Sequence, residues 1–114
     1  MPTDCLFCKI IAGEIPAEII YRDEQVIAIS DINPVAPVHL LLLPIRHLSS
    51  VAEAQAADGA LLGALALTAA RLAVEAGLAR GYRLVINTGA NGGQSVGHLH
   101  QHLIGGRAMR WPPG

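Results

Sequence analysis

The sequence has few charged residues, few aromatic residues and only two cysteines. Its 114 residues include 8 Lys and Arg, 9 Asp and Glu, and 4% aromatic residues. A formal net charge of -1 argues against a nucleic-acid-binding domain, which carries a basic footprint. The sequence also lacks the Lys/Arg-rich amphipathic helix of a membrane-surface protein. We therefore expect neither nucleic acid nor a membrane among the partners.

Long apolar runs and targeting signals are also missing. The uncharged apolar stretch between Asp58 and Arg71 is shorter than the roughly 20 residues that cross a bilayer. Residues 1–4 contain no basic residue of the kind that begins a secretory signal. No internal repeat and no low-complexity linker interrupts the chain. These absences predict a single cytoplasmic domain over residues 1–114.

Apolar residues are abundant and make up 52% of the chain. A small protein with so much apolar surface and so few charges often buries part of that surface between subunits. The composition therefore favours a homodimer.

The order of the expected elements indicates an α+β fold with a mainly antiparallel sheet, one short helix and one long helix. The long helix is expected from Asp58 to a C-cap at Gly77, because leucines and alanines recur there at steps of three and four. A short helix is expected over residues 5–12, and Ser50 with Glu53 has the form of a capping box. Strands are expected over residues 19–21, 26–30, 39–43, 82–87 and 98–104.

Three histidines, His98, His100 and His102, alternate along the last expected strand. Alternate residues of a strand share a face, so the three imidazoles would project the same way at intervals of roughly 6.5–7 Å. Such a row suits either a metal site or nucleophilic and acid–base catalysis by groups that titrate near neutral pH. The row alone does not decide between the two.

The segment before these histidines, residues 88–97, is rich in glycine. Backbone N–H groups of such a loop can converge on an anion, and Gln94 and Ser95 add side-chain donors. Directly before the histidines, this composition is typical of a loop that presents a phosphate to a nucleophile.

Residues 93–107 resemble the motif of the histidine triad (HIT) superfamily. They resemble most the branch of histidine-triad nucleotide-binding proteins, the purine nucleoside phosphoramidases. The resemblance extends over nearly the whole chain, through residues 7–17, 31–39, 82–87 and 110–114. It implies a HIT-like fold, a homodimer, and hydrolysis of the P–N bond of adenosine or guanosine 5′-phosphoramidates to a nucleoside monophosphate and an amine.

The resemblance also implies a role for individual residues. His100 would be the nucleophile and would form a transient nucleotidyl-histidine, while His98, His102 and His39 would hold the site in the correct orientation and protonation state. A second set would bind the purine nucleotide: Asp31 at the ribose, Asn87, Gln94 and Ser95 near the phosphate, and Ile32, Phe7, Ile10 and Ile11 around the base.

Gln101 departs from the family pattern, which has an apolar residue at this position. Its side chain is expected on the face opposite the histidines, beneath the long helix, where an amide needs hydrogen-bond partners. The sequence therefore leaves the packing of that helix on the strand as an open question.

Cys5 and Cys8 form a Cys-x-x-Cys pair, for which a metal site and a redox pair are the alternatives. The sequence lacks the thioredoxin-like context of a redox motif. Several microbial HIT proteins carry such a pair with zinc, and the residues that would complete the site here are His47 and His98. Two thiolates and two imidazoles suit a closed, tetrahedral structural zinc site. The alternative is two buried thiols and a surface His47.

Two other functions remain open at this point. The chain could be a non-catalytic nucleotide-binding or scaffolding protein that retains the pocket, or a zinc hydrolase whose metal is bound by the three histidines. A dinucleoside polyphosphate hydrolase is a further relative within the superfamily, although the ending of the chain, residues 111–114, resembles the phosphoramidase branch.

Overall fold

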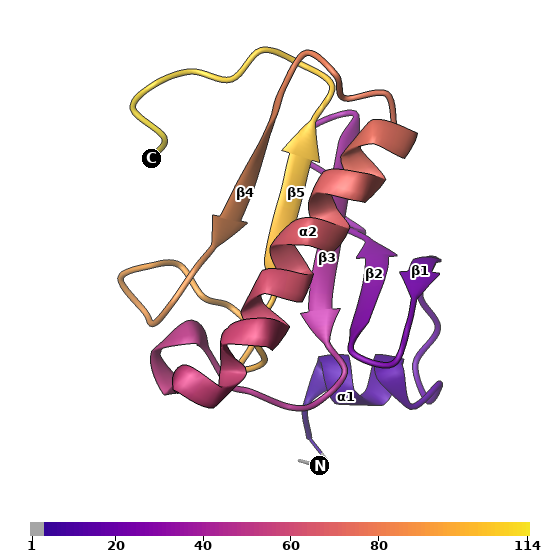
Figure 1. Cartoon of the computed structure of the whole chain (residues 1–114), viewed down its shortest axis with the longest axis vertical. Coiled ribbons are helices and arrows are strands. Elements are labelled where there is room, and N and C mark those ends of the chain that lie inside the picture. Colours follow the sequence, from indigo (N-terminus) through magenta and orange to yellow (C-terminus); the bar gives the residue numbers. More distant parts are fainter. Residues whose placement is uncertain (1–3) are drawn as a thin grey trace.

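The computed structural model describes residues 4–114 and contains a five-stranded sheet of order β1-β2-β3-β5-β4 (Figure 1). Every neighbouring pair of strands is antiparallel. The elements in chain order are α1 (Leu6–Ile11), β1 (Ile19–Arg22), β2 (Val26–Ser30), β3 (Val38–Pro44), the short 3-10 turns η1 (Val51–Glu53) and η2 (Ala56–Asp58), α2 (Gly59–Glu75), β4 (Tyr82–Ile86) and β5 (Gln101–Gly105). The predicted α+β fold is therefore confirmed, and most element ends lie within one or two residues of the expected ones.

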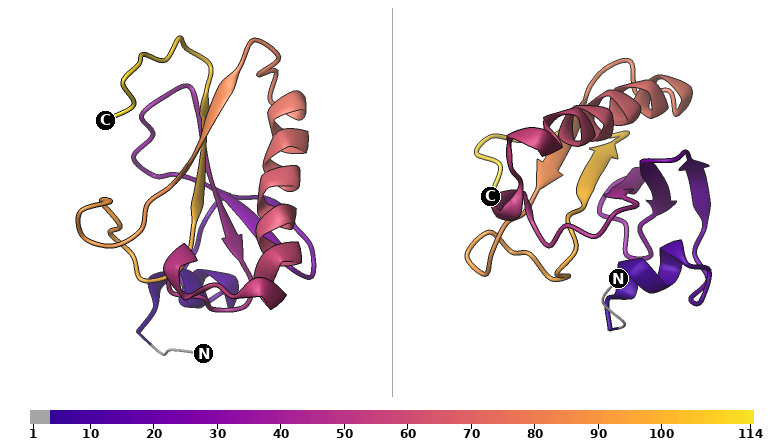
Figure 2. Two further views of the ribbon diagram at one scale, coloured as in Figure 1. Left: turned by 60° about the vertical axis from the view of Figure 1, so that its left-hand side comes forward. Right: turned by 60° about the horizontal axis from the view of Figure 1, so that its bottom comes forward.

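The two helices cover opposite faces of the sheet (Figure 2). Side chains of β2 alternate between two hydrophobic cores: Val26 and Ala28 pack in the core beneath α2, whereas Ile27 and Ile29 pack in the core that contains α1. Both β2 and β3 are buried on both faces, which explains why their sequences are almost continuously apolar.

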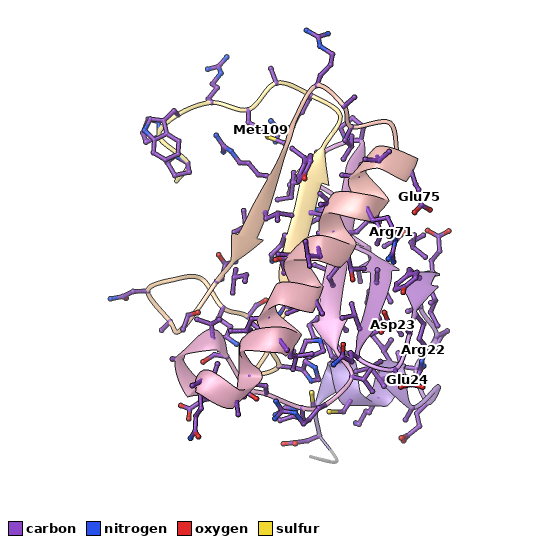
Figure 3. The ribbon with its side chains drawn as sticks, in the orientation of Figure 1. Arg22, Asp23, Glu24, Arg71, Glu75 and Met109 are labelled. Atoms are coloured by element: carbon purple, nitrogen blue, oxygen red, sulfur yellow. The ribbon has the colours of Figure 1, made fainter. Side chains whose placement is uncertain are left out.

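The long helix packs one stripe of its surface on the sheet, through Leu61, Leu65 and Leu72. It ends where expected, because the chain reverses at Gly77 with a φ of 77°, in the left-handed region that glycine adopts without strain. Arg71 connects the outer side of this helix to the β1–β2 hairpin, with its guanidinium 4.5 Å from the centre of the Tyr21 ring (Figure 3).

The segment Ala56–Glu75 has the length and the mean hydropathy, 1.5, of a membrane-spanning helix. Length and composition are weak evidence by themselves, because the core helix of a folded domain has the same properties. In the most apolar 18-residue part of this segment 33% is buried, and the segment contains the charged residues Asp58, Arg71 and Glu75.

The prediction of one strand over residues 98–104 is wrong at its start, because β5 begins at Gln101. His98 and His100 lie in the irregular segment before it, and of the three alternating histidines His102 alone lies on the strand. The reason is that backbone and side-chain groups there bond outside the sheet. The N–H of Leu99, for example, donates to the carbonyl of Leu48 at 2.7 Å. The three imidazoles therefore do not project from one regular strand, and the ring centres of His100 and His102 lie 5.2 Å apart.

Gln101 lies beneath α2, as expected, with 3% of its surface exposed. Its Nε2 donates to the carbonyl oxygen of Leu65 in α2 at 3.0 Å. The amide thus has a partner within the helix that covers it, and the helix packs on the strand with Gln101 beneath it.

Candidate functional site

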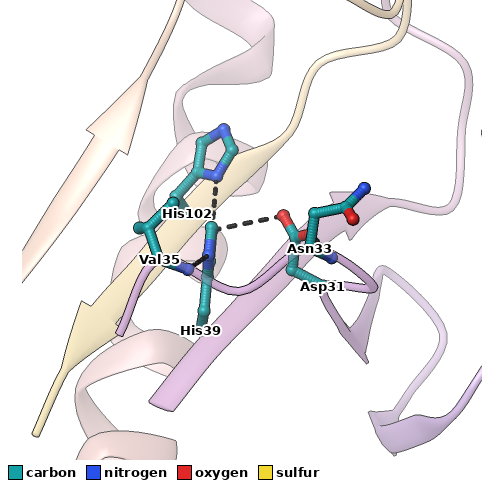
Figure 4. A network of polar contacts seen from close by, with 5 residues as sticks. All are labelled: Asp31, Asn33, Val35, His39 and His102. Atoms are coloured by element: carbon teal, nitrogen blue, oxygen red, sulfur yellow. Dashed lines mark hydrogen bonds and ion pairs between the residues drawn. The ribbon is translucent and has the colours of Figure 1, made fainter. Parts of the chain in front are cut away.

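Neighbouring strands place His39 (β3) and His102 (β5) side by side on the α1 face of the sheet (Figure 4). The Nε2 atom of His39 lies 2.9 Å from Nδ1 of His102 and 3.3 Å from Oδ2 of Asp31. On the other side of the same ring, the N–H of Val35 donates to Nδ1 at 3.2 Å. A nitrogen that accepts a hydrogen bond carries no proton, so these partners assign the proton of neutral His39 to Nε2. His102 then accepts at Nδ1 and carries its own proton on Nε2.

The Nε2 atom of His102 is buried and has no hydrogen-bond partner among residues 4–114. Burial, and then the nearby His100 and His39, lower the pKa of His102 below the usual histidine value. The ring is therefore neutral at pH 7. A buried N–H without a partner costs about 1–3 kcal/mol, which a bound acceptor would recover. The site thus presents one free hydrogen-bond donor.

The depressed pKa of His102 predicts a loss of stability in acid. Above about pH 6.5 the imidazole is neutral in both the folded and the unfolded chain, so its contribution is fully present. As the pH falls from about 6.5 toward the lower folded pKa, the unfolded chain binds the proton first, so the free energy of unfolding decreases until the folded chain is protonated as well. Urea unfolding followed by circular dichroism should show a smaller decrease in His102→Gln, which cannot titrate. Equal pH dependence in the two proteins would contradict this assignment.

His100 is held between aromatic rings and a backbone carbonyl. Its Nδ1 lies 2.7 Å from the carbonyl oxygen of His98, which can only accept, so Nδ1 carries the proton and Nε2 keeps its lone pair. The ring centre lies 5.1 Å from that of Phe7 and 5.2 Å from that of His102, both edge to face. An imidazole fixed with an unprotonated Nε2 is equipped to act as a nucleophile.

Cys5, Cys8, His47 and His98 converge beside α1, with one ligand atom of each within 4.8 Å of all the others. The Nδ1 atom of His98 lies 3.5 Å and 3.6 Å from the two sulfur atoms and 3.1 Å from Nδ1 of His47. The distance from the sulfur of Cys8 to Nδ1 of His47 is 3.3 Å. On the far side of the His98 ring, Nε2 donates to the carbonyl of Pro44 at 2.9 Å, which leaves the Nδ1 lone pair directed at the thiols.

These separations suit tetrahedral zinc. Bonds of about 2.3 Å to sulfur and about 2.05 Å to nitrogen place two nitrogen ligands about 3.3 Å apart and a nitrogen and a sulfur about 3.6 Å apart. Burial and the adjacent Cys5 raise the pKa of the Cys8 thiol to about 11, so a thiolate here needs a cation to balance its charge. Geometry and donor chemistry therefore both fit a closed zinc site.

The three alternating histidines do not share one metal position. Among the described residues, the side chains that could hold an ion form two groups: Cys5, Cys8, His47 and His98 in one, and Asp31, His39 and His102 in the other. The short distances within the second group arise from the direct hydrogen bond between His39 and His102. The geometry therefore does not favour a zinc hydrolase with a three-histidine site.

The residues expected to bind the ribose and the base differ in accessibility. Asp31 is partly exposed, and its Oδ1 accepts the N–H of Asn33 at 2.8 Å. Ile32 projects into solvent with 90% of its surface exposed, whereas Phe7, Ile10 and Ile11 are buried in the core around α1. Within this set, Ile32 offers the largest free apolar surface.

Gln94 organises the glycine-rich loop. Its Oε1 accepts the N–H of Gly89 at 3.0 Å, and its Nε2 donates to the carbonyls of Ser49 at 2.7 Å and Val96 at 3.0 Å. Its amide is thus fully engaged by backbone groups, and a contact with phosphate would need one of these bonds to be exchanged. Two other predicted phosphate contacts, Ser95 and Asn87, lie at the ends of the loop and are exposed and half-buried respectively.

Gly92 makes the tightest turn of this loop. A Cβ atom at this position would lie 2.2 Å from the carbonyl oxygen of Thr88, so Gly92→Ala must displace the backbone. We expect a loss of about 1–3 kcal/mol in the free energy of unfolding, measured with urea. Gly59→Ala is the control, because nothing lies within 4 Å of its added Cβ and its backbone is helical. Equal stability of the two variants would contradict the close contact at Gly92.

Sequence reasoning missed two residues that act through their backbone. Val35 donates to His39, and Pro44 accepts from His98. Neither side chain carries a chemical signal, so no motif could have identified them.

Comparisons with known proteins agree with this architecture. The sequence pattern of the HIT domain family matches residues 12–109. An uncharacterized HIT-like protein of Synechococcus elongatus is 52% identical over 114 residues, which cover 100% of both chains. The crystal structure of a HIT family hydrolase from Legionella pneumophila superposes with a TM-score of 0.96 at 47% identity, covering 97% of this chain and 100% of that one.

Two further solved structures bear on ligands. A histidine triad nucleotide-binding protein from Candida albicans has a TM-score of 0.82 at 28% identity, covering 96% of this chain and 83% of that one. A Zn-bound histidine triad family protein from Mycobacterium smegmatis has a TM-score of 0.79 at 34% identity, covering 91% of this chain and 76% of that one.

Proposed function

We propose, from the premise that this chain belongs to the HIT domain family, that it hydrolyses the P–N bond of purine nucleoside 5′-phosphoramidates. The products are a nucleoside monophosphate and an amine. The observation that supports this best is the arrangement of protons on two adjacent imidazoles. Hydrogen-bond partners leave His100 with an unprotonated Nε2 and His102 with a free Nε2–H.

These two groups suit a two-step reaction. In the first step, Nε2 of His100 attacks the α-phosphorus and the P–N bond to the amine breaks. The leaving nitrogen takes up a proton from a water molecule, while the Nε2–H of neutral His102 donates a hydrogen bond to the reacting phosphate. In the second step, the oxygen of that water molecule replaces His100 on phosphorus, which returns the lone pair to Nε2 of His100 and leaves both histidines in their starting protonation state. The carbonyl of His98 holds the Nδ1 proton of His100 throughout and stabilises the positive charge that the modified ring acquires.

The surroundings of the histidines support a purine nucleotide as the substrate. The carboxylate of Asp31 suits the two ribose hydroxyls, and the exposed Ile32 suits one face of a base. In this proposal Ser95 and Asn87, with N–H groups of the loop, contact the phosphate. The Candida albicans neighbour is itself described as nucleotide-binding.

We further propose that Cys5, Cys8, His47 and His98 hold a structural zinc ion, as the donor set and its spacing support. Zinc would cross-link α1 to the sheet and would take no part in the chemical step. Because the carbonyl of His98 also holds the His100 ring, fixing His98 would stabilise the nucleophile in its orientation. Two free cysteines are consistent with a reducing, cytoplasmic compartment.

We also propose a homodimer that forms through β4. This strand lies at the edge of the sheet and exposes Tyr82, Leu84 and Ile86 on one face. An apolar edge strand invites pairing with another chain. Sedimentation of the protein would show a dimer, and Leu84→Lys would shift it toward the monomer.

Mass spectrometry of a quenched reaction tests the catalytic proposal. When the protein is mixed with an adenosine phosphoramidate and denatured at alkaline pH within one turnover, we expect an adenylyl group on the peptide that contains His100. Turnover without an adduct on this peptide, under conditions that preserve phosphohistidine, would exclude the nucleophile. Binding without turnover would instead favour the non-catalytic nucleotide-binding function.

A further inference from the structure

We propose that Arg107 is a positioning residue that sets the proton arrangement of His39 and His102 by holding the backbone of Val35. Its effect on catalysis rests on the function proposed above, whereas its effect on the histidines does not. Arg107 follows β5, and its contact is with Val35, 72 residues earlier in the chain, in the loop that precedes β3.

The guanidinium of Arg107 directs two of its nitrogen atoms at one carbonyl oxygen. Its Nε and Nη2 atoms lie 3.2 Å and 3.1 Å from the carbonyl oxygen of Val35, and its Nη1 donates to the carbonyl of Ala108 at 3.3 Å. Two charged donors on one oxygen restrict its orientation more than a single hydrogen bond does. The side chain of Val35 is 57% exposed and contributes little packing, so hydrogen bonds to its backbone hold this residue in place.

The other side of Val35 faces the catalytic histidines. Its N–H donates to Nδ1 of His39, and this contact assigns the His39 proton to Nε2 (Figure 4). His39 in turn donates to Nδ1 of His102, which leaves the His102 proton on Nε2. A continuous series of hydrogen bonds therefore runs from the surface to the free Nε2–H donor in the site, through Arg107, Val35, His39 and His102.

Gly106 allows this arrangement. The residue has a φ of 96°, and a Cβ atom on it would lie 2.9 Å from Cβ of Pro37. The end of β5 therefore lies directly against the loop, which places the next residue, Arg107, beside Val35. The opposite end of the loop is closed by the Asp31 N–H, which donates to the His39 carbonyl at 3.0 Å.

Removal of the guanidinium would free Val35 to turn away from His39. His39 could then also carry its proton on Nδ1, where the N–H of Val35 would no longer exclude it, and the Asp31 carboxylate, 3.3 Å from Nε2, would be the remaining group that favours the Nε2 proton. With the proton on Nδ1, Nε2 of His39 would accept from His102, and His102 would lose the Nε2–H that the reaction needs. Arg107 thus acts on the tautomer of two histidines that it does not touch.

Nitrogen-15 NMR of the imidazoles tests the inference directly. At about pH 8, where histidines are neutral, we expect the wild-type protein to show His39 and His102 each as a single Nε2–H tautomer. Arg107→Ala should give mixed tautomers at both. Arg80→Ala is the matched control: its arginine is exposed at the same end of the molecule and makes no side-chain hydrogen bond within residues 4–114, so both signals should stay as in the wild type.

A second variant displaces the same loop from another side. Gly106→Ala keeps the guanidinium but pushes against Pro37, and it should produce the same mixture of tautomers. In both variants kcat/KM should fall about tenfold or more, as for the loss of a residue that orients a catalytic histidine, with most of the loss in kcat. Arg107→Lys should recover part of the activity, because an ammonium can donate one hydrogen bond to the carbonyl.

Unchanged tautomers in both Arg107→Ala and Gly106→Ala, in folded protein, would overturn the inference. The NMR result does not depend on turnover. If the chain proved unable to cleave phosphoramidates, the tautomers would still decide whether Arg107 positions His39.

Discussion

His100→Ala is expected to lower kcat/KM for an adenosine phosphoramidate by about 10³-fold or more and to leave the affinity for AMP within a few fold. Removal of a nucleophile abolishes the covalent route, and what remains is catalysis by binding and by the other polar groups. The affinity for AMP should survive, because the groups proposed to bind it, such as Asp31 and Ile32, lie on a different segment. Single-turnover kinetics and calorimetric titration with AMP measure the two quantities.

The control for His100→Ala must account for lost packing, since the ring is buried against Phe7. Ile29→Ala removes a side chain from the same core on β2, a strand that carries none of the histidines. It should lower the thermal midpoint while retaining most of the activity. Near wild-type turnover by His100→Ala would refute the nucleophile, and loss of AMP binding together with activity would point to a disordered site instead.

Loss of the metal site should have the second largest effect. We expect the purified, reduced protein to contain about one zinc ion per chain by elemental analysis, and Cys8→Ser to contain almost none. The variant should lose several kcal/mol of stability, measured by urea unfolding, because zinc would cross-link α1 to residues 47 and 98 on other segments. Metal content and stability report on the site without any need for activity.

Lys9→Ala is the matched control for the cysteine variant, since Lys9 follows Cys8 in α1 but takes no part in the ligand cluster. It should keep the zinc and the stability of the wild type. Catalysis by Cys8→Ser should fall about 10–100-fold rather than vanish, because His98 loses its fixed orientation while His100 remains. A wild-type protein that binds no zinc when zinc is supplied in excess would show that the cluster is a set of buried thiols and imidazoles.

Much of the fold could be predicted from local patterns. The stripe of α2 and the continuous apolar runs of β2 and β3 arise from burial on one or two faces, which is a property of neighbouring residues. The start of β5 was not predictable in this way. Alternation of histidines and apolar residues favours a strand over residues 98–104, but hydrogen bonds to Leu48 and Pro44, distant in sequence, hold the first three residues outside the sheet.

The candidate site shows the same division. The Cys-x-x-Cys pair and the family resemblance together named every member of the cluster formed by Cys5, Cys8, His47 and His98. The sequence also indicated a need for a partner at Gln101, but the partner proved to be a backbone carbonyl of α2. Backbone partners carry no residue-specific signal, and this explains why Val35, Pro44 and the role of Arg107 were not expected.

The sequence by itself determined the α+β fold, the family and the identity of the chemical groups. The tertiary structure decided which nitrogen of each histidine bears a proton. That choice depends on the carbonyl of His98, the N–H of Val35 and the carbonyl of Pro44, three backbone groups that folding brings to the imidazoles of His100, His39 and His98. A tautomer is set by its hydrogen-bond partners, and those partners exist only in the folded chain.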